Sequence, residues 1–370
     1  MFEILSRWLG GLTPGSQLSR RAWLEIYYTP KGESDVKDIS EDVSKYFLSL
    51  SWSDNMSGRV DDVTLTLEDR GHLWSSSWFP TQGSTLSFVV HTYNWKNLSD
   101  GEKTLDLGQF EIDEIEITGM PSTVQIKAVS AASDNTLRGV KRNRTWEEIS
   151  IKKCATDICD DNAVKLFWDC ASDPNLDHIE QSDQSDLDFL QKVTGDAGLS
   201  LKVQKEQVII FDEEAYEGKD PAVLFLKPGT LTDSDLEIFG KLTGYSFRAK
   251  TRDTYKACHV KYQHSESKAL IEATFAAPDK TDGKTLEVSE QVDTVAEAEK
   301  LARKKLREAN REEVTGSMSM PGTFDIYAGQ TVQLANFGAF DGKYIVTKVS
   351  SSIGASFTTT VEIRRCLDGY

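Results

Sequence analysis

The chain has 370 residues, of which 39% are hydrophobic and 27% are charged, and its 59 acidic and 42 basic residues give a formal net charge of −17. This composition predicts a folded protein of two or three domains and excludes a disordered chain. The negative charge argues against sequence-specific or wrapping contacts with nucleic acid, because those need a basic surface. No run of about 18 apolar residues is present, so we expect no transmembrane helix and no membrane partner.

The chain begins with MFEILSRWLGGLTPGSQLSR. This stretch carries Glu3 and has no basic region ahead of its apolar residues, so it is a poor signal peptide. We predict that residues 1–20 form an N-terminal arm.

Residues 21–144 are predicted to be a first β-barrel domain. In residues 47–70, FLSLSWSDNMSGRVDDVTLTLEDR, polar and apolar side chains alternate on both sides of a polar bend. Neighbouring side chains on a strand point to opposite faces, so this pattern predicts two paired strands with one buried face. Strands are expected at 22–30, 46–53, 62–69, 84–92, 104–117 and 122–130, which favours a small antiparallel barrel or sandwich.

The segment WSSSWFP, residues 74–80, concentrates aromatic side chains in a predicted loop of this domain. One interpretation is a cap that covers an end of the barrel. The other is a contact patch for a partner, since exposed aromatic residues often anchor interfaces. The sequence favours neither interpretation over the other.

Residues 145–235 are predicted to be a small α/β domain, reached through a basic, linker-like run at Lys141–Arg144. Ser150 is a candidate N-cap for a helix that contains Cys154 and Ile158. A strand at 164–168, a second helix opened by the capping box at 185–188, and a hairpin of strands 199–203 and 208–211 follow.

Two features of this region raise the question of a metal. Cys154 and Cys159 do not have zinc-knuckle spacing, and on one helix they would face apart, so structural thiols are predicted for this chain of five cysteines. The acidic stretch from Asp173 begins like a calcium loop, but His178 stands where glycine is needed and Gln184 where glutamate is needed. An EF-hand is therefore rejected, and a loose divalent site is the minor alternative.

Residues 236–370 are predicted to be a second β-barrel domain that contains an inserted helix at 295–311. Thr294-Val-Ala-Glu297 is a capping box for this helix. The apolar face is predicted to point inward and the basic residues outward, either into solvent or against an acidic partner or neighbour. The inward set is Val295, Ala298, Leu301, Ala302, Leu306 and Ala309, and the outward set is Lys300, Arg303, Lys304, Lys305 and Arg307.

A pattern recurs near the two ends of the chain. Residues 83–88 and 108–115, GSTLSF and GQFEIDEI, have the same spacing of glycine and apolar residues as 329–334 and 342–349, GQTVQL and GKYIVTKV. Alternating strands at 124–127 and 361–364 follow the two pieces. We interpret this as a duplicated β-unit with one copy in each predicted barrel.

No enzyme motif is present. The chain has no G-x-S-x-G elbow, no H-E-x-x-H and no Walker loop, and its five histidines are scattered. His259 and His264 are predicted to lie on opposite faces of one strand. We therefore predict no catalytic, cofactor-binding or metal-binding residues, no cofactor and no enzymatic activity.

The chain resembles the phage late control D family, which contains tail or baseplate hub proteins of contractile phages and related injection systems. The resemblance runs from about Arg21 to Leu367. It is carried by three stretches, LSLSWSDNMSGRVDDVTLTLEDRGHLW (48–74), GQFEIDEIEITGMPSTVQIKAVSAASDNTL (108–137) and EQSDQSDLDFLQKVTGDAGLSLKVQKEQVIIF (180–211).

This resemblance implies a virion structural protein that forms a homotrimer. Two related barrels in each of three subunits would give a pseudo-sixfold ring that adapts a tail tube to a central spike, with other baseplate proteins nearby. The implied location is the virion tail or a phage-tail-like particle, assembled in the bacterial host cytoplasm. The alternatives from the residues are a cell-surface-binding β module, for which Trp74 and Trp78 are the best support, and a tail-associated cell-wall hydrolase.

Overall fold

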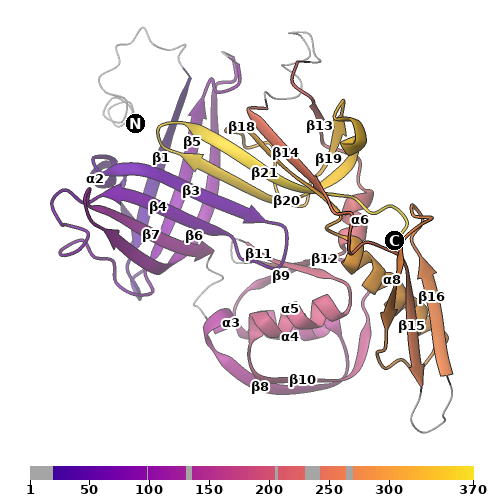
Figure 1. The fold of residues 1–370 in the computed structure, drawn as a ribbon. Coiled ribbons are helices and arrows are strands. Elements are labelled where there is room, and N and C mark those ends of the chain that lie inside the picture. Colours follow the sequence, from indigo (N-terminus) through magenta and orange to yellow (C-terminus); the bar gives the residue numbers. More distant parts are fainter. Residues whose placement is uncertain (1–19, 98, 131–135, 205–206, 230–241, 264–269) are drawn as a thin grey trace. The chain divides into compact units, whose positions relative to one another are not determined.

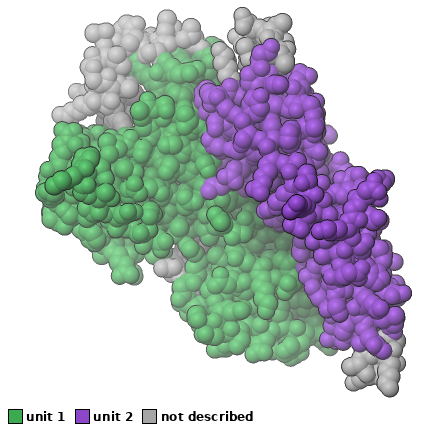
Figure 2. Space-filling model, viewed as in Figure 1, with its two compact units in different colours: residues 1–211, 322–325, 350–359 green, residues 212–321, 326–349, 360–370 purple. Residues whose placement is uncertain are grey.

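The computed structural model describes residues 20–97, 99–130, 136–204, 207–229, 242–263 and 270–370. The protein is mainly β, as predicted, and divides into two compact units, which Figure 2 colours separately. Unit 1 comprises residues 1–211, 322–325 and 350–359, and unit 2 comprises 212–321, 326–349 and 360–370. The predicted arm at 1–19 lies outside the described residues, and the predicted domain boundaries at 144 and 235 stay predictions.

The first half of unit 1 is an antiparallel sheet that folds over a single core. Figure 1 shows β3, β4 and β7 crossing in front of β1 and β5. The strand order is β3-β4-β7-β6-β5-β1-β2, with a short helix, α2 (Ser40–Ser44), beside β1. The strands are β1 (Arg21–Thr29), β2 (Lys37–Asp38), β3 (Phe47–Asn55), β4 (Asp62–Glu68), β5 (Thr85–Tyr93), β6 (Glu102–Thr118) and β7 (Thr123–Ser130).

The predicted alternation explains this sheet. Every second residue of β4 and β7 is buried, and Leu50, Leu65 and Ile126 meet in the core. Each fully buried side chain of this size contributes about 1.5–3 kcal/mol. The long strand β6 pairs first with β5 and then with β7, and its register shifts near Gly108 and at Asp113. Such bulges bend a strand, so β6 turns from one layer to the other.

The second half of unit 1 is the predicted α/β region. A three-stranded sheet, in the order β11-β12-β9, and a two-stranded ribbon, β8-β10, pack with α4 and α5 around one core. Ser150 and Ser185 accept hydrogen bonds from backbone N–H groups three residues on, so both predicted N-caps are confirmed. The elements are α3 (Thr136–Gly139), β8 (Lys141–Ser150), α4 (Ile151–Asp161), β9 (Lys165–Asp169), β10 (Asn175–Ser185), α5 (Asp186–Asp196), β11 (Ser200–Gln204) and β12 (Gln207–Phe211).

The structure corrects two expectations here. The basic run Lys141–Arg144 is not a linker but the start of β8, and the acidic stretch that begins like a calcium loop contains β10. The two strands pair along most of their lengths. The basic side chains are placed against the acidic ones, for example Lys141 with Asp183 at 3.1 Å. Opposite charges that look like separate runs in the sequence are thus neighbours across a ribbon.

Unit 2 contains a second group of paired strands, mixed in direction, and a small lobe that packs on one long helix. The sheet elements are β13 (Val223–Leu226), β14 (Gly244–Ala249), β18 (Val314–Pro321), β19 (Thr331–Ala335), β20 (Gly342–Ile353) and β21 (Phe357–Arg365), with η2 (Gly338–Phe340) between β19 and β20. The lobe contains β15 (Tyr255–Gln263), β16 (Leu270–Ala276), β17 (Lys284–Val288) and α8 (Val295–Asn310). The helix α6 (Glu213–Gly218) precedes β13.

The predicted duplication appears as a shared strand order. The first repeat runs β3-β4-β7-β6-β5-β1, and the second runs β14-β18-β21-β20-β19-β13, with each strand in the same place in chain order. The repeats differ in the pairing of their first strands, because β1 runs antiparallel to β5 whereas β13 runs parallel to β19. The lobe is inserted between β14 and β18, where the first repeat has only the turn 56–61.

The predicted helix at 295–311 is confirmed as α8, and Thr294 caps it by accepting the Glu297 N–H. Ala298, Ala302 and Leu306 are buried against the lobe, as expected. Val295 was predicted inward, but its side chain is 54% exposed. It stands at the first position of the helix, ahead of the turn that packs on the sheet.

Candidate functional site

The aromatic loop lies at one end of the first sheet and is held by a buried carboxylate. Asp69 accepts hydrogen bonds from the Trp74 N–H at 3.2 Å and from the Ser75 hydroxyl at 3.3 Å. The Trp78 N–H donates to the Leu73 carbonyl at 2.8 Å. Because Asp69 is only 1% exposed, the loop is held by hydrogen bonds to a carboxylate that lies in the core.

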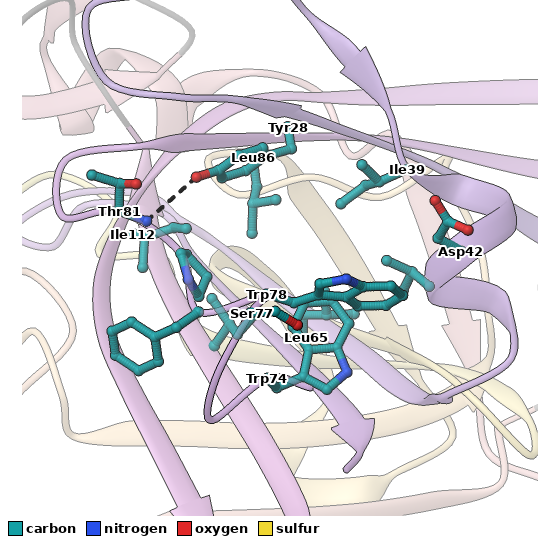
Figure 3. Close-up of a pocket in the computed structure, with 14 residues that line it drawn as sticks. Tyr28, Ile39, Asp42, Leu65, Trp74, Ser77, Trp78, Thr81, Leu86 and Ile112 are labelled. Atoms are coloured by element: carbon teal, nitrogen blue, oxygen red, sulfur yellow. Dashed lines mark hydrogen bonds between the residues drawn. The ribbon is translucent and has the colours of Figure 1, made fainter. Parts of the chain in front are cut away.

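Beside this loop lies a pocket of about 400 Å³. Figure 3 shows the Trp74 and Trp78 side chains next to each other on one side and Asp42 on the rim. The two indoles pack edge to face with centroids 5.3 Å apart. The Thr81 N–H donates to the Tyr28 hydroxyl at 3.4 Å across the other wall. The pocket is therefore mostly apolar, with few polar groups at its edge.

The two interpretations of the loop apply to different residues. Trp74 is 5% exposed and closes the core, which is the role of a cap. Trp78 and Phe79 are 37% and 55% exposed, so they form an apolar surface that a partner could cover. The sequence could not make this distinction, because the two tryptophans are equivalent in a loop with no periodicity.

A charged cluster joins the β3–β4 turn to β11 within unit 1. Lys202 is only 8% exposed. Its ammonium pairs with Asp54 and lies 3.8 Å from Asp61. Asp61 also accepts the Asn55 N–H at 2.7 Å. Burial, opposed by Lys202 and reinforced by Asp54, raises the pKa of Asp61 to about 7.

This cluster predicts that stability falls as pH rises. The folded protein keeps a proton on Asp61 up to a pKa of about 7, whereas the unfolded chain releases it near 3.8. The folded state therefore binds more protons between pH 4 and 7, and the free energy of unfolding decreases across that window. Asp61→Asn should remove this dependence and stabilise the protein by about 1–3 kcal/mol at pH 8, measured by urea unfolding at pH 5 and 8. A loss of stability in Asp61→Asn at pH 5 as well as at pH 8 would instead mean that Asp61 is ionised in the folded protein at both pH values.

The basic face of α8 pairs largely with acidic residues of its own unit. Arg303 lies 2.5 Å from Glu214, Arg307 lies 2.7 Å from Glu217 and Lys305 lies 2.6 Å from Glu290. The acidic neighbour expected for this basic face therefore belongs to the same chain, and most of it is α6. This face is a poor candidate for an external acidic partner.

The other residues considered at the sequence level are not assembled into a reactive site. Cys154 and Cys159 are both buried in α4, and burial raises the pKa of each thiol to about 12, which makes both unreactive. His91 stacks on Trp23 at 5.0 Å, and His259 contacts Thr274 at 2.8 Å. His264 lies outside the described residues. Within the described ranges, no group of three or more His, Cys, Asp or Glu residues could hold a metal ion.

Among the residues that the structure describes, no helix is both long and apolar enough to cross a membrane.

The chain is similar to known tail proteins in sequence. The family model described as phage tail baseplate hub (GPD) matches residues 112–356. The chain is 25% identical over 238 residues to a probable baseplate hub protein of Escherichia phage 186, which covers 62% of this chain and 54% of that protein. It spans about half the length of the curated relatives that it matches.

Solved structures share the fold. A tail protein from Neisseria meningitidis MC58 superposes with a TM-score of 0.67 at 11% identity, covering 94% of this chain and 97% of that one. A chain of the Francisella PdpA-VgrG complex superposes with a TM-score of 0.59 at 10% identity, covering 99% of this chain and 61% of that one. These likenesses extend across both repeats and the inserted regions. Because the family model matches about two thirds of its residues, this chain belongs to the phage tail baseplate hub family.

Proposed function

We propose that this protein is a structural, non-enzymatic hub of a phage baseplate or phage-tail-like particle. In this proposal three copies form a ring of six related β-units that adapts a sixfold tail tube to a threefold central spike. The observation that carries it is the duplicated strand order, β3-β4-β7-β6-β5-β1 and β14-β18-β21-β20-β19-β13. Two similar units in each of three chains supply six similar positions around a closed ring.

The proposed partners are the tail tube protein at one face of the ring, the spike protein at the other and further baseplate proteins at the periphery. Membership of the hub family supports this assignment, as does the likeness to a chain of a VgrG complex. The proposed location is the virion tail, after assembly in the host cytoplasm. The net charge of −17 suits a channel through which DNA passes without adhering.

The solution mass of the purified chain tests the ring. Light scattering should give about three times the chain mass of 41.3 kDa, and electron micrographs should show a ring with a central channel. A monomer at micromolar concentration, both alone and with the tube and spike proteins, would contradict the proposal. Turnover of purified cell wall by the isolated chain would contradict the non-enzymatic part.

The exposed pair Trp78 and Phe79 favours a second role, attachment to a partner or a cell surface. Trp78→Ala and Phe79→Ala variants should keep the trimer mass if these residues lie outside the ring contacts. Binding to cells that is lost in both variants would assign them to surface recognition, and loss of a baseplate partner in a pull-down would assign them to assembly.

A further inference from the structure

One sheet edge in the second repeat is open where the matching edge of the first repeat is covered. In unit 1, β3 pairs with β4 on one side and with β20 on the other. The part of β20 that belongs to unit 1 begins at Ser350, and it leads into the turn at Gly354, which lies against the Leu48 carbonyl. Across this region Ser351, Ile353 and Phe357 are buried.

The strand equivalent to β3 is β14, and its outer edge has no strand partner among the described residues. Five of its six residues are exposed, including Tyr245 at 44%. It contains no proline, and Arg248 is its one charged residue, so its backbone N–H and C=O groups are available for pairing with another strand.

The strand equivalent to β20 is β6, whose second half is open on the side away from β7. The first part of β6 pairs with β5 as far as Glu111, and residues 112–118 pair with β7 alone among the described strands. The side chains of 116–120 are exposed, with Ile117 at 44%. In the first repeat, β3 is covered by β20. The same chain therefore has one open edge on β14, the equivalent of β3, and another on β6, the equivalent of β20.

We propose that β14 of one copy pairs with the second half of β6 in the next copy. This contact would repeat between chains the junction that β3 and β20 make within one chain. Because the two edges differ, the interface is head-to-tail, and a rotation of about 120° from one copy to the next closes three copies into a ring. The inference rests on the proposed ring and identifies the surfaces that close it.

Length and charge agree with this pairing. Six residues of β14 extend for about 20 Å, which matches the open half of β6. Arg248, with Lys250 and Arg252 after it, makes the β14 edge basic, and Lys250 also lies 3.4 Å from Glu312. Asp113, Glu114 and Glu116 make the β6 edge acidic, and Lys127 of β7 lies 2.9 Å from Glu114 and 3.4 Å from Glu116. The two edges therefore still differ in the sign of their net charge. Opposite charge on two facing edges favours this partner and fixes its orientation.

The hydrogen-bond pattern of β14 selects a variant for the test. The Lys250 N–H donates to the Glu313 carbonyl of the neighbouring chain segment at 2.8 Å. N–H groups alternate in direction along a strand, so Ser246 and Arg248, two and four residues before Lys250, also direct theirs toward β18. The residues between them, such as Phe247 and Ala249, direct their N–H groups to the open edge. Ala249→Pro removes one outward donor and leaves the bonds to β18 in place, whereas Ser246→Pro removes an inward donor.

The first arm of the test is solution mass. Ala249→Pro and the double variant Arg248→Glu/Arg252→Glu should each reduce a trimer to monomers with an unchanged circular dichroism spectrum. Adding Asp113→Lys/Glu116→Lys to the charge variant should restore the trimer. Ser246→Pro is the matched control that disturbs the fold itself. Trimers that persist in both edge variants would overturn the inference.

The second arm is an interchain disulfide, which separates failure of the edge contact from failure of the ring. Chains carrying Ser246→Cys are mixed with chains carrying one cysteine at positions 114–118, then mildly oxidised. Adjacent strands bring only one or two of these positions within the distance a disulfide spans, so only those should cross-link. A wild-type trimer without cross-links overturns the edge contact and leaves the ring standing. If the wild-type chain is a monomer but the cysteine variants cross-link into dimers, the edge contact is supported and the trimer is overturned. If the wild-type chain is a monomer and no cross-link forms, both are overturned.

Discussion

Arg364→Leu is expected to lower the free energy of unfolding of unit 2 by about 3 kcal/mol. Arg364 is 2% exposed and lies 2.8 Å from Glu213 and 2.5 Å from Glu217, both of which are buried in α6. Removing the guanidinium leaves two carboxylates without their main partner inside the protein. The loss stays near 3 kcal/mol because Glu217 keeps Arg307 and the Leu367 N–H, at 2.7 and 2.8 Å.

The physical basis of this prediction is the length of α6. A helix of six residues, Glu213–Gly218, has too few internal hydrogen bonds to be stable alone. Its two buried glutamates anchor it to the end of β21, to α8 and to the C-terminal segment. Disrupting that network should therefore release α6 first.

Hydrogen exchange is the suitable measurement, because all eight tryptophans precede Asp169 and report only on unit 1 or the arm. Amides of 213–218 and 360–367 should lose protection in Arg364→Leu by a factor of about 100, the equivalent of about 3 kcal/mol. Arg311→Leu is the control, since Arg311 is 42% exposed and 3.6 Å from Glu213, and should cost under 1 kcal/mol. Equal losses of protection in Arg364→Leu and Arg311→Leu would show that the burial of Arg364 with Glu213 and Glu217 adds nothing to the stability of unit 2.

Local patterns were sufficient to predict most strands of the first sheet and three helix caps. Alternation identified β3, β4 and β7 within one or two residues, and the Ser150, Ser185 and Thr294 caps were confirmed. These features depend on neighbours in sequence, either the period of two or a side chain three residues from an N–H. The repeated glycine spacing also led to the correct equivalence of β5 and β6 with β19 and β20.

Long-range pairing was the information that the sequence did not provide. Lys141–Arg144 looked like a linker because its partners lie about forty residues away. Asp183 was assigned to the acidic stretch that begins like a calcium loop, and Asp186 to the start of a helix. Lys202 gave no signal at all, since a single lysine in a hairpin normally faces solvent, and its two aspartates lie about 150 and 140 residues earlier. The open edges of β14 and β6 are likewise a property of the whole sheet order, which no window of sequence contains.

The second large effect on stability is expected in the aromatic loop, where one tryptophan is buried and the other is partly exposed. Trp74→Ala is expected to reduce the free energy of unfolding by about 3 kcal/mol, because it removes a buried indole that closes the core beside an existing cavity. Urea unfolding followed by the remaining tryptophans measures this loss in unit 1. Trp78→Ala removes a side chain that is 37% exposed and should reduce it by only about 1 kcal/mol.

The contrast between these two variants decides what the loop is for. Trp78 touches Tyr46 and Trp74 edge to face, at 5.8 and 5.3 Å, so its ring is oriented by contacts with the core while one side stays open to solvent. An aromatic ring held in this way loses little conformational freedom when a partner covers it, which is the property of an interface anchor. If Trp78→Ala proves as destabilising as Trp74→Ala, both tryptophans are cap residues and the anchor role is lost. If it is nearly neutral for folding yet abolishes a contact in the assembled particle, the exposed half of the loop is a docking surface supported by its buried half.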